Sequence, residues 1–211
     1  MESLHHLLDA PQLLALAAAL GWVSGIRLYA AVFIVGVLGY GGWWELPAGL
    51  QVLQHPAVLA ASGFMCFVEF FADKIPLLDS VWDTVHTVIR VPAGAALAAA
   101  ALGADGPAMA WIAALLGGGL AATSHATKMS ARAAVNTSPE PFSNIAVSLF
   151  EDGFVVFMLW LAAAHPLVFA AVLVLSITVA LVLLVVLVKF LRAAIRRVSD
   201  LFAGRRPLQG R

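Results

Sequence analysis

Charged residues are scarce in this chain of 211 residues: 12 basic and 12 acidic side chains make up 11% of it, and 62% of the residues are hydrophobic. Soluble domains carry roughly 25% charged residues, so the composition excludes an ordinary soluble domain. It indicates a helical protein that crosses a membrane several times, because helices satisfy their own backbone polar groups in lipid. The expected fold class is all-α, a polytopic membrane helix bundle.

Cysteine and motifs of known chemistry are also missing. Cys66 is the only cysteine, which excludes an intramolecular disulfide. The Gly-x-Ser-x-Gly, His-Glu-x-x-His, Walker and dinucleotide-binding patterns are absent. Asp83 and His86 resemble one half of a carboxylate-bridged metal site, with Glu151 and Asp152 as further oxygen ligands, but the second half is missing. The sequence therefore identifies no catalytic residue, cofactor or metal, and we expect no nucleic-acid binding.

The few charges are distributed unevenly. Seven of the 12 bases lie from Lys189 onward beside one acid, Asp200, so residues 1–188 hold five bases and eleven acids. We expect three parts: an N-terminal segment 1–11, a single membrane domain 12–188 and a basic tail 189–211. The tail is typical of segments that meet anionic lipid.

Hydrophobic stretches predict about six spans. Five are expected at residues 12–40, 56–72, 108–129, 144–164 and 167–188, the last on the periphery. Residues 92–104 would reach only ~20 Å, so they form a span only if residues 77–90 enter the membrane as well. Two polar segments that contain proline, one around Pro76 and one at 136–144, are expected to be interrupted or re-entrant.

Lysine and arginine placement predicts the topology. The proposed loops 41–55, 103–107 and 164–166 contain neither residue, whereas the opposite connections and the tail contain many. The positive-inside rule then places both termini in the cytoplasm of a multi-pass membrane protein.

An acidic set, followed by an acidic pair later in the chain, forms the candidate coupling or ion-binding site. Embedded carboxylates bind a cation, pair with a base or hold a proton. The alternative is that Asp79 and Asp83 lie on a solvated helix outside the membrane. The residues of this set are Glu69, Asp73, Asp79, Asp83, Glu151 and Asp152.

Basic and amide side chains form a candidate ligand-binding set. Arg27 lies in the middle of an apolar stretch, and His125, Lys128 and Arg132 share one helical face. The bases could pair with the acids, hold an anionic ligand or anchor the chain at the cytoplasmic face. Residues 136–144 could contribute ligands or form an ordinary turn. The residues of this set are Arg27, Lys74, Arg90, His125, Lys128, Arg132, Asn136, Glu140 and Asn144.

Several motifs together resemble a known family. They are Ser24-Gly25-Ile26-Arg27-Leu28-Tyr29, Asp73-Lys74-Ile75-Pro76 with Asp79 and Trp82-Asp83, Ile89-Arg90-Val91-Pro92-Ala93-Gly94, and Asn136-Thr137-Ser138-Pro139-Glu140-Pro141 with Ser143-Asn144 and Glu151-Asp152. Over residues 12–188 the chain resembles an uncharacterised bacterial integral-membrane family, the domain of unknown function 4126. The resemblance implies a membrane fold and brings no activity or substrate.

The sequence favours a small transporter or channel with a polar vestibule facing the cytoplasm, coupled to protons or cations. Two alternatives stay open: a membrane enzyme acting on a lipid or lipid-linked phosphate, and a non-catalytic membrane scaffold. The expected partners are the lipid bilayer, a small solute, ion or lipid ligand, and further copies of the chain in a homo-oligomer.

Overall fold

The computed structural model describes residues 10–103, 106–137 and 141–202. Its described residues are helical with no strand, which confirms the expected all-α polytopic bundle. The elements are α1 (Ala10–Tyr40), the 3-10 helix η1 (Ala48–Gln54), α2 (Pro56–Ala72), α3 (Leu78–Leu102), α4 (Pro107–Val135), α5 (Pro141–Ala164) and α6 (Pro166–Phe202).

By length and composition alone, five or six of the described helical elements could span a membrane. Helices α1, α3, α4, α5 and α6 are each long and apolar enough to cross a membrane. A sixth span results if η1 and α2, which meet at an angle of 70°, are counted together. The protein is therefore a multi-pass membrane protein.

Proline marks where helices begin more often than where they break. Pro56, Pro107, Pro141 and Pro166 each open a helix, where a missing N–H costs nothing. Pro92 lies inside α3, which runs continuously from Leu78 to Leu102. Residues 78–90 and 92–102 therefore lie in one continuous helix, as the short length of the second piece required.

The two polar segments that contain proline are connections between helices. Pro76 separates α2 from α3, as predicted, and Leu77 beside it has a φ of 70°, which is unusual for a residue with a side chain. The second segment follows α4, which ends at Val135, and its residues 138–140 lie outside the described part.

Helix α1 folds back on itself at Arg27, whose φ of −143° and ψ of 77° are extended and not helical. Before the bend, α1 runs antiparallel to α3. Leu14 lines a cavity together with Leu102, and the carbonyl oxygen of Gly21 lies beside Gly94. The first half of α1 therefore descends along α3 from its C-terminal end.

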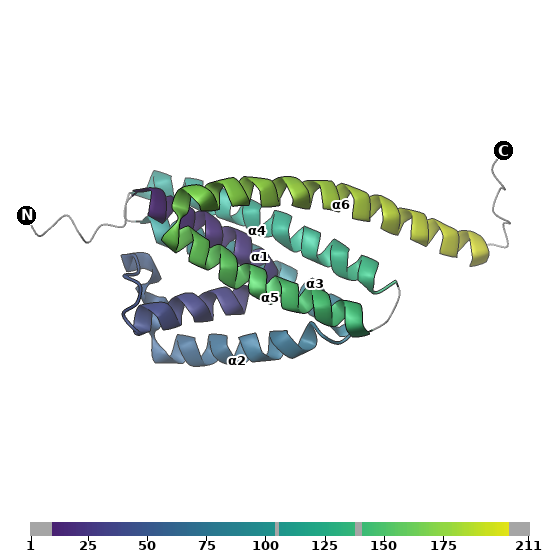
Figure 1. The fold of residues 1–211 in the computed structure, drawn as a ribbon, viewed down its shortest axis with the longest axis horizontal. Coiled ribbons are helices and arrows are strands. Elements are labelled where there is room, and N and C mark those ends of the chain that lie inside the picture. The colour runs from purple at the N-terminus through teal and green to yellow at the C-terminus, as the bar shows by residue number, and fades with distance from the viewer. Residues whose placement is uncertain (1–9, 104–105, 138–140, 203–211) are drawn as a thin grey trace, which may run out of the picture.

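After the bend, α1 runs back in the direction of α3. The hydroxyl of Tyr29 lies 3.1 Å from Nε2 of His86, and Val32 lines a cavity with Leu97, further along α3. Figure 1 shows the two halves running to the same end of the bundle. The re-entrant element of this chain is therefore α1, and its tip is at Arg27.

This path corrects the expected topology. The sequence predicts one complete crossing for residues 12–40, which would place both termini on one side of the membrane. Because α1 returns, both of its ends lie at one end of the bundle, and α6 ends at the opposite end (Figure 1). Mean apolarity could not reveal the bend, since both halves of α1 are apolar.

The apolar core surrounds the first half of α1. In the most apolar window of α1, 67% of the residues are buried, against 11% in α6, which confirms that α6 is peripheral. Gly25 permits this packing, because a Cβ there would lie 2.0 Å from Ser124 Oγ and 2.2 Å from the Ala121 oxygen. Helix α6 continues past its predicted end at Val188 to Phe202.

Candidate functional site

The tip of α1 ends inside a group of buried charged side chains, which we call the ion network. It contains every lysine and arginine of residues 1–188 and six of the eleven acids there. Its members are Arg27, Lys74, Arg90, Lys128, Arg132, Glu69, Asp73, Asp79, Asp83, Glu151 and Asp152.

Asp73 lies at the centre of the network. It caps α2 at its C-terminal end, and its Oδ2 is 2.7 Å from Arg27 Nη1 and 2.6 Å from Lys128 Nζ. Burial alone would raise the pKa of this carboxyl, but Lys128 and Arg27 outweigh burial and hold the pKa below its usual value. Through its contacts with Arg27 and Lys128, Asp73 joins the tip of α1 to α4.

Helix α3 carries a second group of ion pairs, centred on Arg90. Arg90 Nη1 donates to Asp83 Oδ1 over 2.6 Å, and Arg90 Nη2 donates to Glu69 of α2. Lys128 Nζ also approaches Asp83 Oδ1 at 3.2 Å. The spacing of seven residues between Asp83 and Arg90 brings both onto one face of the helix, as the sequence predicted.

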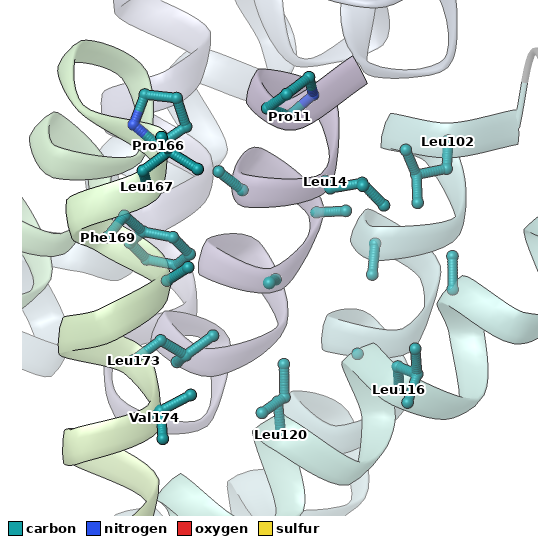
Figure 2. Close-up of a pocket in the computed structure, with 17 residues that line it drawn as sticks. Pro11, Leu14, Leu102, Leu116, Leu120, Pro166, Leu167, Phe169, Leu173 and Val174 are labelled. Carbon is teal, nitrogen blue, oxygen red and sulfur yellow. The ribbon is translucent and has the colours of Figure 1, made fainter. Parts of the chain in front are cut away.

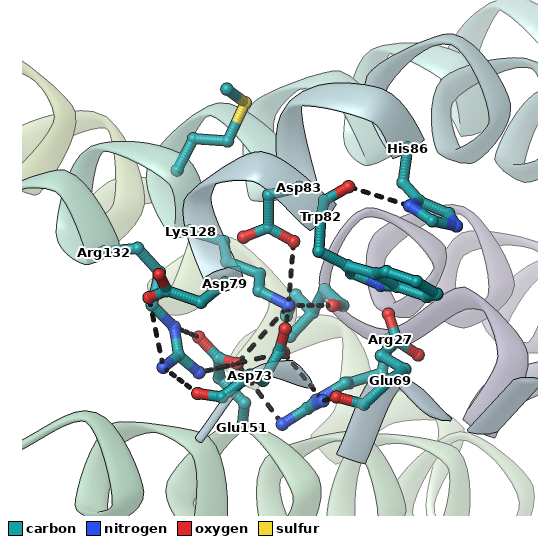
Figure 3. Close-up of polar contacts among 12 residues, drawn as sticks. Arg27, Glu69, Asp73, Asp79, Trp82, Asp83, His86, Lys128, Arg132 and Glu151 are labelled. Carbon is teal, nitrogen blue, oxygen red and sulfur yellow. Dashed lines mark hydrogen bonds and ion pairs between the residues drawn. The ribbon is translucent and has the colours of Figure 1, made fainter. Parts of the chain in front are cut away.

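Arg132 of α4 binds α5 and the turn after α2. Its Nη2 donates to Glu151 Oε2 over 2.7 Å, and its Nη1 donates to the Asp73 carbonyl over 2.8 Å and to the Asn144 carbonyl over 3.2 Å. Figure 3 shows Lys128 and Arg132 both pointing from α4 toward the acids. Of the alternatives for these bases, ion pairing is the one that the contacts show.

Asp79 stands slightly apart, in the first turn of α3. Its Oδ1 accepts from the Asn136 side chain over 2.8 Å and from the Ser80 backbone over 2.6 Å. Asn144 Nδ2 in turn donates to Asn136 Oδ1 over 2.8 Å. Asp79 and Asp83 are both fully buried, so the alternative of a solvated helix is wrong. Glu140 lies outside the described residues.

The partly exposed edge of the network lies between α2 and α5. Asp152 is 29% exposed and Lys74 17%, and Oδ2 of the acid is 3.9 Å from Nζ of the base. Burial lowers the pKa of the Lys74 ammonium. Asp152 Oδ1 lies 3.1 Å from Arg27 Nε, which connects this edge to the interior.

Histidines border the network without joining a metal site. His125 Nε2 is 2.8 Å from Thr87 Oγ1, and its Nδ1 is 3.1 Å from the Gly25 carbonyl. His86 stacks on Trp82 and contacts Tyr29. Among the described residues, no group of three or more His, Cys, Asp or Glu side chains is arranged to hold a metal ion.

The sequence analysis missed the neutral partners of the charges. Ser148 Oγ accepts from Arg27 Nη2 over 2.8 Å and from Lys74 Nζ over 3.2 Å, yet it was not among the candidates. Its position three residues before Glu151 on α5 puts both on one helical face, which is the signal that would have found it.

Besides the cavity lined by Val32 and Leu97, the described residues line two larger apolar cavities. One, of about 530 Å³, lies between α1, α3, α4 and α6, and Figure 2 shows Pro11, Leu102 and Pro166 around the same end of it. The other, of about 450 Å³, lies between α4, α5 and α6, and Lys128 and Glu151 form part of its wall. The second cavity therefore borders the ion network.

These features define a multi-pass helical membrane protein with a re-entrant first helix and a buried ion network. Residues 14–186 match the family described as "Domain of unknown function (DUF4126)", and the chain belongs to this family. No curated protein and no solved structure matches the chain.

Proposed function

We propose that the protein is a small transporter or channel coupled to protons or to a monovalent cation. One observation carries this proposal: among the residues that the structure describes, the ion network holds six carboxylates against five bases. When all eleven groups are ionised, one negative charge is in excess. Because an unbalanced buried charge is costly, the network is suited to take up one proton or one small cation.

His125 is poorly placed to supply the balancing charge. Its Nδ1 lies 3.2 Å from Arg90 Nη1, so a protonated imidazole would face a guanidinium. The balance is therefore best restored at a carboxylate, either by a proton or by a bound cation.

The re-entrant path of α1 supports transport. Non-helical backbone within a membrane is tolerated where it is buried in protein or borders a water-filled path. Transporters place ion sites at such interrupted helices, since the free carbonyls at the broken end contribute ligands. Here Lys128 Nζ donates to the Ile26 carbonyl over 3.1 Å, and Nδ1 of His125 lies 3.1 Å from the Gly25 carbonyl. Movement of the tip would release these carbonyls to a transported cation.

Asp79 is the best candidate for the excess charge. Among the described residues its only ion pair is with Arg132, at 3.8 Å, whereas each of the other five carboxylates has a basic nitrogen within 3.1 Å. Its Oδ2 is buried and has no hydrogen-bond donor among those residues. Proton or cation binding at Asp79 thus disturbs the fewest existing ion pairs.

We place this polar end of the bundle in the cytoplasm of a bacterial inner membrane. Lys74, Arg132 and the described tail bases Lys189, Arg192, Arg196 and Arg197 lie toward that end, and residues 1–26 contain no lysine or arginine. The positive-inside rule therefore puts Ala10 on the outer side, opposite Phe202. The bundle would be surrounded by lipid.

Flux into proteoliposomes tests the proposal. Vesicles with purified protein and an imposed membrane potential should take up H⁺ or Na⁺ faster than empty vesicles, as followed by dyes for each ion. Asp79→Asn removes the excess charge but keeps the acceptor for Asn136, so it should fold and lose the flux. Glu45→Gln, which removes an acid outside the network, should leave the flux unchanged. Absence of H⁺, Na⁺ and K⁺ flux in the unaltered protein would refute the proposal.

The cavity between α4, α5 and α6 favours a second candidate, a protein that acts on or carries a lipid. Its wall is apolar except where Lys128, Glu151 and nearby hydroxyls reach it, which suits an acyl chain beside a polar headgroup. Native mass spectrometry of the detergent-purified protein would detect a retained lipid, and the same spectrum reports whether copies of the chain form a homo-oligomer. Lipid retained by the unaltered protein and lost with Phe154→Trp, which fills the cavity, would favour this candidate.

A further inference from the structure

Among the described residues, the ion network reaches the protein surface on one side, where the exposure of its side chains decreases from the surface inward. Asp152 is 29% exposed and Lys74 17%, Glu151 is 9% exposed, and the remaining members are at most 2% exposed by side chain. A small cation that approaches the network therefore meets Asp152 and Lys74 first.

Lys74 is the base with the weakest ionic contact in the network. Each of the other four bases has a carboxylate oxygen within 2.7 Å, whereas Lys74 Nζ is 3.9 Å from Asp152. Its closer partners are neutral: it donates to the Phe70 carbonyl at 3.0 Å and to Ser148 at 3.2 Å, and it lies over the Phe70 ring. Because its stem is flexible, this ammonium is the easiest to displace.

Deeper in the network, some buried carboxylate oxygens have no hydrogen-bond donor among the described residues. Arg27 connects Asp152 at 3.1 Å to Asp73 at 2.7 Å. Asp73 Oδ1 and Asp83 Oδ2, on side chains that are fully buried, have no hydrogen-bond donor among the described residues. These oxygens point to a positively charged ligand, since unpartnered buried carboxylate oxygens are costly.

We infer that Asp152 is the entry site for a small cation and that the Lys74 ammonium is a tethered competitor that occupies this site. The incoming cation takes the place of Lys74 beside Asp152, and Lys74 turns outward. The onward passage of the cation rests on the proposed function, but the competition at Asp152 does not.

Ser148 provides a reporter directly behind Lys74, and the lone Cys66 makes labelling specific. In a Cys66→Ser background, Ser148→Cys should react slowly with a methanethiosulfonate that carries a trimethylammonium group. Adding Lys74→Met should accelerate this reaction about tenfold, the factor expected for losing one modest ionic contact. Lys74→Arg should stay slow, because it keeps a cation in place.

Asp152 should determine whether the cationic or the anionic reagent reacts faster. In the Lys74→Met variant, the cationic reagent should react faster than its sulfonate counterpart, and adding Asp152→Asn should remove this preference. Ser124→Cys, buried in the core away from Lys74, is the control and should stay unreactive throughout. The inference would be overturned by equal rates with and without Lys74→Met, or by the absence of a preference for the cationic reagent. It would also be overturned if Lys74→Met accelerated the reaction at Ser124→Cys to the same extent, because that would mean that the whole bundle had loosened.

The labelling experiment needs no transport. Cation-selective labelling in a protein without flux would contradict the proposed function and leave the entry site standing. If flux depends on Asp79 but the labelling rate does not change with Lys74→Met, only the entry site is contradicted.

Discussion

Helices α1 and α6 are both long and apolar, with 31 and 37 residues, yet they behave differently. Helix α6 runs continuously from Pro166 to Phe202, and 11% of its most apolar window is buried. Helix α1 bends back at Arg27, and 67% of its window is buried. The first lysine or arginine in α6 is Lys189, whereas α1 carries Arg27 near its middle.

The difference shows that an apolar stretch becomes a crossing or a re-entrant hairpin according to its partners. A lone arginine at the middle of a span costs about 2.5–3.5 kcal/mol on insertion scales. In α1 this cost is offset because Arg27 reaches Asp73, Asp152 and Ser148 on neighbouring elements. The extended backbone at Arg27 brings its guanidinium into the network, and the chain returns from there.

The largest expected effect concerns the sides of the membrane on which the two ends lie. An epitope tag placed before Ala10 should be accessible to antibody on intact spheroplasts, and a tag after Phe202 only after permeabilisation. A tag at His165, between α5 and α6, is an internal reference and should behave like the first tag. If both terminal tags lie on the same side, α1 crosses the membrane as α6 does and the comparison fails.

Removal of the Arg27 charge should have the next largest effect. Arg27→Met removes the Arg27 partner of the buried Asp73 carboxylate and leaves Asp152 with Lys74 as its remaining base, and breaking a buried ion pair costs about 3–5 kcal/mol. We expect a large fall in the thermal unfolding midpoint in detergent and in the yield of monodisperse protein. Lys189→Met removes a base from exposed α6 and should change neither; an equal loss there would mean that Arg27 has no special role.

A smaller effect is expected where α1 meets α4. Gly25→Val would push its side chain against Ser124 and Ala121, and overpacking of this kind costs about 1–3 kcal/mol. Gly119→Val on α4 is the matched control, since a Cβ there meets nothing within 4 Å. Thermal unfolding of both variants checks the pair, and equal midpoints would contradict the close approach of the two helices.

Much of the candidate site could be predicted from sequence. In a chain so poor in charge, charged side chains within apolar stretches have to face protein or water. For this reason the sequence predicts all eleven members of the network as candidate site residues. Pairing was harder to predict. Helical spacing groups Asp83 with Arg90, but it cannot join Asp73 to Lys128, which are 55 residues apart.

The path of α1 could not be predicted, and it puts the start of α1 and the end of α6 at opposite ends of the bundle. The charge bias itself was informative: the lack of lysine and arginine in residues 1–26 agrees with an N-terminal segment on the outer side. The error came from counting residues 12–40 as a crossing on length alone. Ser148 was overlooked for a related reason, because a serine in an apolar run has no charge to mark it.

The sequence by itself determined that this protein is a helical membrane bundle, where most helices begin and which side chains are too polar for lipid. These follow from composition, proline positions and the cost of charge in hydrocarbon, all of which are local properties. Only the tertiary structure decided that α1 turns back and that six acids meet five bases at its tip. The reason is that such pairing depends on side chains from five elements being close in space, and no local pattern encodes that distance.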